Sequence, residues 1–176
     1  KPPKLVNCLG GRAARSGPEH GDAFHHFAAI YEWDNGLRAH HTCRQIEGAE
    51  PTDNTDYVYG TKGRAVVNGW APKTLKLYDY SGKVIWAYKG EPDDMYQVEH
   101  NELFKSIRAG KPNNDCPRAP HSVLMAIMGR MAAYTGKQVT WEFALNSKEN
   151  LQPASLSWDM HPPEPVVAIP GKTKLI

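Results

Sequence analysis

An Asn-Gly pair at residues 35–36 limits the fold more than any other feature, because it separates strand-like segments at residues 24–33 and 37–46. Both residues accept the positive φ of a two-residue hairpin turn, so the pair predicts a β-hairpin. A two-residue turn sets Trp33 opposite Arg38 in the pairing register. One face of the hairpin then carries large, amphipathic side chains: Phe27, Tyr31, Trp33, Arg38, His40 and Arg44. The other face is mostly small, which suits covering helices, so we expect the large face to be open to a second subunit or a ligand.

Further hairpins follow at short spacing. Residues 56–59 and 64–67 flank one turn, and residues 74–78 and 84–88 flank a second turn that contains Ser81-Gly82. Consecutive hairpins of this kind predict an antiparallel meander.

The second half of the chain has helical periodicity. Residues 93–109 place apolar and aromatic side chains on one stripe: Tyr96, His100, Leu103, Phe104 and Ile107. A longer helix is predicted at residues 120–135, with Pro120 in its first turn and Gly136 as its C-terminal cap. A short helical turn is expected near residues 141–145.

Strands followed by helices predict an α+β fold. We expect a largely antiparallel, partly mixed open sheet with helices packed on one face. Residues 1–150 are predicted to form this single domain. Residues 151–176 are rich in proline and are predicted to lie extended over the same domain as an arm.

Composition excludes several classes of partner. Apolar residues make up 40% of the 176 residues, and the formal net charge is only +2, so the sequence favours neither a nucleic-acid nor a membrane partner. Residue 1 is lysine, and no signal peptide precedes the strand-like run that begins at Leu5. We therefore expect a soluble piece of a longer protein, cytoplasmic or periplasmic according to any signal upstream of residue 1.

Metal and catalytic motifs are weak. In the predicted register the strand histidines lie too far apart to share a metal ion, and we expect no metal site. No serine or cysteine occupies a recognisable nucleophile motif. No glycine-rich strand–turn–helix unit that would bind a dinucleotide is present in the sequence.

Residues 10–22 are the one segment whose composition suggests binding. Arg12 and Arg15 in this loop have the chemistry to hold a carboxylate or several hydroxyl groups. His20 can orient a polar ligand beside them. The alternative is a solvated surface loop with local ion pairs, and composition alone leaves both interpretations open.

The ordered set of motifs resembles a known family. The motifs are Gly10-Gly11-Arg12, Asp34-Asn35-Gly36, Cys43-Arg44-Gln45 and residues 59–63, 96–104, 107–112 and 124–136. Together they are similar to the C-terminal domain of the glucose–fructose oxidoreductase, inositol dehydrogenase and MocA-like oxidoreductases. The likeness runs from about Leu5 to Ile176. One departure is visible at His25, near which the family pattern leads us to expect an acid.

The resemblance implies a two-domain parent that uses NAD or NADP. Its Rossmann domain, catalytic lysine and Asp/His helix would lie before Lys1, so no catalytic and no cofactor-binding residue is assigned to this chain. We expect the chain alone to be inactive and to bind no nicotinamide cofactor tightly. Its role would be to bind a sugar, polyol or sugar derivative and to form a homo-oligomer through the open sheet face.

The predicted substrate-binding residues are Arg12, Arg15, His20 and Arg44, and the predicted oligomer face comprises Phe27, Tyr31, Trp33, Arg38 and His40. The alternative function is a free-standing, non-catalytic module that binds a carbohydrate or another protein through the same face.

Overall fold

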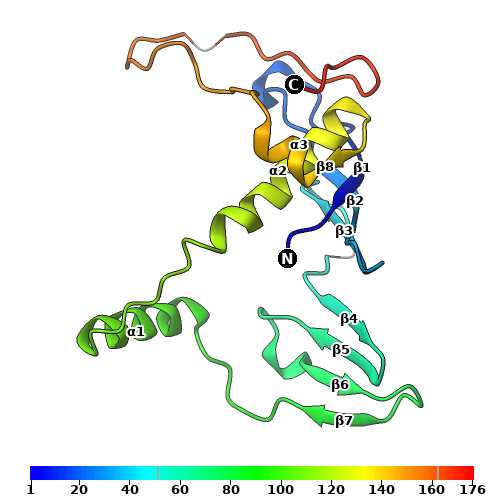
Figure 1. The fold of residues 1–176 in the computed structure, drawn as a ribbon, viewed down its shortest axis with the longest axis vertical. Helices are drawn as coiled ribbons and strands as arrows, with labels where there is room; N and C mark the ends of the chain where they lie inside the picture. Colours follow the sequence, from blue (N-terminus) through cyan, green and yellow to red (C-terminus); the bar gives the residue numbers. More distant parts are fainter. Residues whose placement is uncertain (51, 162) are drawn as a thin grey trace. The chain divides into compact units, whose positions relative to one another are not determined.

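A computed structural model describes residues 1–50, 52–161 and 163–176 (Figure 1). Its contacts group the chain into two compact units. Unit 1 comprises residues 1–48 and 115–176, and unit 2 comprises residues 49–114. The expected domain of residues 1–150 therefore contains all of unit 2 and part of unit 1. Pro162 of the predicted arm lies outside the described residues.

Unit 1 is built on a four-stranded sheet, here named sheet A. Its strands are β1 (Leu5–Gly11), β2 (His26–Glu32), β3 (Arg38–Arg44) and β8 (Val139–Thr140), in the order β3-β2-β1-β8. Every pair in the sheet is antiparallel. β8 was not predicted, because two residues are too short to show the alternation that identifies a strand.

The β2–β3 hairpin forms as predicted, but the predicted register is wrong by one residue. Glu32 pairs with Arg38, and the amide of Trp33 donates to the carbonyl of Leu37 over 3.0 Å. The loop thus has three residues and ends with Gly36 in the left-handed region, at φ +80°. Three-residue loops of this kind end in a left-handed residue, for which glycine is the least strained choice.

The register decides which side chains share a face, since directly paired residues lie on the same side of a sheet. Helix α2 (Ala119–Thr135) packs on the face that holds Val6, Ala29 and Tyr31, all of which are buried. The Tyr31 hydroxyl donates to the Met125 carbonyl over 2.9 Å. A Cβ at Gly129 would lie 2.8 Å from that hydroxyl, so the helix approaches the sheet closely only with glycine at this position.

The predicted oligomer face is therefore not one face. Phe27, Tyr31 and Trp33 belong to the helix-covered side, where Phe27 and Trp33 pack against the core cluster. Arg38 and His40 pair with Glu32 and Ile30, whose side chains alternate to the opposite, open side. The prediction that these five side chains share one face was wrong because it assumed a two-residue turn.

The core of unit 1 joins sheet A, α2 and α3 (Trp141–Asn146) (Figure 1). Its buried apolar residues are Val6, Cys8, Phe24, Ala29, Tyr31, Met128, Met131, Ala132, Ala133, Val139 and Ala144. Gly136 caps α2 at φ +69°, as predicted. The Thr140 hydroxyl accepts from the Phe143 amide and so caps α3.

Unit 2 contains the meander as predicted. Its strands are β4 (Asp56–Gly60), β5 (Gly63–Val67), β6 (Lys76–Tyr78) and β7 (Val84–Ala87), paired antiparallel in that order and here named sheet B. Helix α1 (Met95–Arg108) follows, and the Asp94 carboxylate caps it by accepting from the amides of Tyr96 and Gln97. The α+β class with antiparallel open sheets is thus confirmed.

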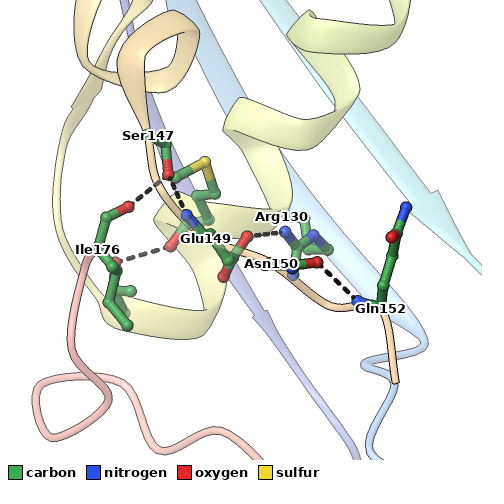
Figure 2. Close-up of polar contacts among 8 residues, drawn as sticks. Arg130, Ser147, Glu149, Asn150, Gln152 and Ile176 are labelled. Carbon is green, nitrogen blue, oxygen red and sulfur yellow. Dashed lines mark hydrogen bonds and ion pairs between the residues drawn. The ribbon is translucent and has the colours of Figure 1, made fainter. Parts of the chain in front are cut away.

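The described residues after α3 contain neither helix nor strand. The Ser147 hydroxyl donates to the carbonyl of Ile176 and so joins the two ends of this segment, and Glu149 pairs with Arg130 of α2 (Figure 2). The Gly171 amide also donates to the Thr135 carbonyl over 2.8 Å. Trp158, between these attachments, is fully exposed.

Candidate functional site

The predicted binding loop leaves sheet A at the end of β1, where Gly10 and Gly11 stand. A Cβ at Gly10 would lie 2.8 Å from the carbonyl oxygen of His26 and 3.1 Å from the Cβ of Ala133. Glycine is therefore needed because the backbone of β1 is pressed between β2 and α2. The close approach fixes the direction in which the loop departs.

Arg12 holds the loop together. Its guanidinium donates to three main-chain carbonyls: those of Arg15 (2.8 Å), Gly21 (2.6 Å) and Gly17 (3.2 Å). The rigid, fork-like arrangement of guanidinium donors suits this task. Sequence reasoning assigned Arg12 to a substrate, whereas its hydrogen bonds in the structure serve the loop itself.

Arg15 and His20 are the other predicted binding residues of this loop. Arg15 is half-buried, and its carbonyl is one of the three that Arg12 holds. His20 ends a short 3₁₀ turn, η1 (Pro18–His20), with its Nε2 at 3.4 Å from a carboxylate oxygen of Glu19. Both residues are part of the folded loop, and their binding to a substrate stays a prediction.

Arg44 reaches the same end of sheet A from β3. It pairs with His26 of β2, and His26 pairs in turn with Gly11 of β1. Gly11, His26 and Arg44 thus form one row across three strands, on the open side of the sheet. The structure brings Arg44 to the base of the loop that carries Arg12 and Arg15, although 29 or more positions separate them in sequence.

Sequence reasoning missed the importance of His25 and His26. His25 is 6% exposed, and its Nε2 accepts hydrogen bonds from the amides of Ala13 (2.6 Å) and Ala14 (3.1 Å). Its Nδ1 lies 3.3 Å from the Nδ1 of His26. The available signal was the histidine found where the family resemblance leads us to expect an acid.

The open side of sheet A carries a shallow hollow of about 440 Å³. Leu9, Ala28 and Ile30 supply its apolar floor, with Leu9 79% exposed. Polar side chains of Asn7, His40, Thr42 and Gln138 surround this floor, and Gln138 donates to Asn7 over 3.3 Å. An apolar centre inside a polar rim is the composition of a protein interface.

Burial shifts two titratable groups beneath this sheet. Desolvation raises the pKa of the Cys8 thiol and the pKa of the Tyr31 hydroxyl. Both groups therefore stay protonated at neutral pH, and Cys8 behaves as a small apolar residue.

Across residues 1–50, 52–161 and 163–176, no three histidine, cysteine or acidic side chains converge as metal ligands would. Among those same residues, every helix is too short or too polar to span a bilayer.

The fold is similar to that of solved oxidoreductases. WlbA dehydrogenase from Bordetella pertussis, solved with NADH and UDP-GlcNAcA, matches with a TM-score of 0.53 at 14% identity over 79% of this chain. Levoglucosan dehydrogenase, in complex with NADH and levoglucosan, matches with a TM-score of 0.61 at 16% identity, also over 79%. An oxidoreductase from Agrobacterium radiobacter, in complex with NAD+, L-tartaric acid and magnesium, matches with a TM-score of 0.55 at 12% identity over 79% of this chain.

This chain spans 39%, 45% and 43% of those three proteins. At these identities the matches show a shared fold with part of each of the three oxidoreductases, which is the fold that the sequence resemblance implies. No protein-family profile matches the sequence, and the comparison with curated proteins found no match.

Proposed function

We propose that this chain is the substrate-binding and oligomerisation part of an NAD(P)-dependent oxidoreductase that acts on a sugar, polyol or sugar derivative. The observation that carries the proposal is the fold likeness to WlbA dehydrogenase and levoglucosan dehydrogenase. Each was solved with NADH and a sugar-derived ligand, and this chain spans less than half of each.

In this proposal the nicotinamide cofactor is bound by another part of the parent protein. The sequence of this chain contains no glycine-rich strand–turn–helix unit, which is the usual pyrophosphate-binding element. The chain's residues would orient the substrate, while the cofactor would supply the hydride chemistry.

The intact mass of the natural gene product tests this arrangement. We expect a mass near twice the 19.6 kDa of this chain, with NAD(P)-dependent activity only in the longer protein. A natural product near 20 kDa would replace the proposal with the non-catalytic module that binds a carbohydrate or a protein.

Cofactor binding is tested separately on this chain. Titration with NADH, followed by tryptophan fluorescence, is expected to show no tight, saturable binding. Saturation at micromolar NADH would contradict the proposed division of labour.

For the substrate site, we propose Arg12, Arg15, His20 and Arg44 as residues that border the ligand, with Arg12 acting through the shape of the loop. Arg15→Gln in the longer protein is expected to raise KM about tenfold, since a hydrogen bond from a charged group contributes about 1.5–3 kcal/mol. Lys62→Gln, in the exposed β4–β5 turn, is the matched control. An unchanged KM in the Arg15 variant would remove that residue from the site.

For the oligomer, we propose the open side of sheet A, around Leu9 and Ile30, with Arg38 and His40 at its edge. Leu9→Lys is expected to convert a homo-oligomer to a monomer in light scattering at tens of micromolar protein. Leu156→Lys is the matched control, because Leu156 is similarly exposed, at 84% against 79% for Leu9, but lies in the C-terminal segment. A wild-type monomer under the same conditions would contradict the proposed role of this face.

A further inference from the structure

The paired histidines His25 and His26 fix each other's tautomers. A neutral imidazole has one protonated and one unprotonated nitrogen. Two backbone amides, those of Ala13 and Ala14, donate to the Nε2 of His25, so this nitrogen is the unprotonated one. The proton of neutral His25 therefore sits on Nδ1.

The same logic extends to the second ring. The Nδ1 of His25 lies 3.3 Å from the Nδ1 of His26, and two protonated nitrogens cannot hydrogen-bond to each other. His26 must accept at Nδ1 and carries its proton on Nε2. The chain of hydrogen bonds from Ala13 through both rings thus ends in a single N–H donor, the Nε2–H of His26.

The donor stands at the edge of the proposed substrate site. His26 is only partly buried and belongs to the open row between Gly11 and Arg44. A Cβ at Gly11 would lie 3.3 Å from both the Cε1 and the Nε2 of His26, so glycine keeps that edge of the ring uncovered. Gly11 also precedes Arg12, whose guanidinium holds the adjoining loop through the carbonyls of Arg15 and Gly21.

We propose that His26 is a ligand-contacting residue that donates its Nε2–H to a hydroxyl oxygen of the substrate, and that His25 is the positioning residue that fixes this donor. The substrate class, a polyhydroxylated compound, rests on the proposed function. The tautomer assignment rests only on the contacts of this chain. A neutral donor matches an uncharged hydroxyl acceptor, and a hydroxyl group can still donate its own proton elsewhere.

The first experiment measures the tautomers directly. Long-range ¹H–¹⁵N spectra of this chain, labelled at histidine, are expected to show His25 protonated only on Nδ1 and His26 protonated only on Nε2. A His26 ring protonated on Nδ1, or one averaging between tautomers, would overturn the proposal. This measurement on the wild-type chain needs no variant and no substrate.

Variants then test the positioning role. In His25→Leu the amides of Ala13 and Ala14 should exchange about five- to tenfold faster, as expected for the loss of one hydrogen bond each. The His26 ring should begin to average between tautomers in the same variant. His161→Leu, at an exposed position, is the control and should change neither the amide exchange rates nor the tautomer of His26. Unchanged exchange at Ala13 and Ala14 would contradict the role of His25.

Steady-state kinetics of the longer gene product test the contact with substrate. His26→Leu should raise KM for the polyol substrate about tenfold, and His26→Gln, which retains an N–H donor, should recover part of the loss. A KM unchanged in both variants would overturn the ligand contact. If the gene product has no oxidoreductase activity, the proposed function and the proposed ligand contact both fail. The tautomer spectra would still show whether His25 fixes the tautomer of His26.

Discussion

Unit 1 and unit 2 have similar secondary structure but very different interiors. Within the described part of the chain, all eleven residues of the buried hydrophobic core belong to unit 1. In unit 2 the aromatic side chains of Tyr59, Trp86 and Phe104 remain between 49% and 65% exposed. Both units satisfy their backbone hydrogen bonds with antiparallel strands and a capped helix. The comparison shows that strand pairing and helix capping can occur without the burial of apolar side chains that stabilises a domain.

The largest expected difference concerns truncation of an apolar side chain. Met128 is 0% exposed at the centre of α2, so Met128→Ala should lower the free energy of unfolding of unit 1 by about 2–5 kcal/mol. Phe104→Ala, at a 52% exposed position of α1, should cost less than about 1 kcal/mol. Urea denaturation of both variants measures the contrast. Equal losses would mean that Phe104 is buried in solution.

Amide exchange compares the two sheets in one experiment. Amides at the centre of β2 should exchange at least about 100-fold more slowly than those at the centre of β4, because opening β2 disrupts the core of unit 1. Exchange in both sheets is followed by mass spectrometry of the wild-type chain. Equal protection in β4 and β2 would mean that unit 2 is stabilised by contacts beyond those described.

A smaller effect is expected at the contact between α2 and sheet A. Gly129→Ala should cost about 1–2 kcal/mol, since its Cβ would stand 2.8 Å from the Tyr31 hydroxyl. Adding Tyr31→Phe removes that hydroxyl and should recover part of the loss, a coupling that a double-mutant cycle measures. Additive effects of the two substitutions would show that the helix moves to accommodate the methyl group.

The smallest expected effect is a dependence of stability on alkaline pH. Burial raises the pKa of Cys8 and Tyr31, so the folded chain retains protons that the unfolded chain loses. The resulting stability is present below the ordinary thiol pKa of about 8.5 and is lost as pH rises beyond it. Between pH 7 and 10 the thermal unfolding temperature should fall more steeply for the wild type than for Cys8→Ala. Parallel curves for the two proteins would contradict a contribution of Cys8 to this pH dependence.

Several elements could be predicted because their signals are local. The period of apolar residues predicted α1 and α2 to within two residues at each end, and Asp94 and Gly136 mark their caps. Glycines at 60 and 63 flank the β4–β5 turn and Gly82 lies in the β6–β7 turn, and they indicated where the chain reverses. The site was predictable only in part: the loop and Arg44 were chosen by residue type, whereas the role of Arg12 depends on carbonyls that only the folded loop brings together.

The sequence by itself determined the α+β class, the order of the strands and helices other than β8, and the position of the β2–β3 reversal at Asn35-Gly36. It did not determine the length of that turn, since Asn-Gly is compatible with loops of two and of three residues. One residue of register moves every side chain to the other face. Only the tertiary structure, through the packing of α2 on Tyr31, decided which face is covered and which is open. The pairing of His25 with Ala13 and Ala14 was likewise decided there, because hydrogen bonds across a folded loop leave no periodic trace in the sequence.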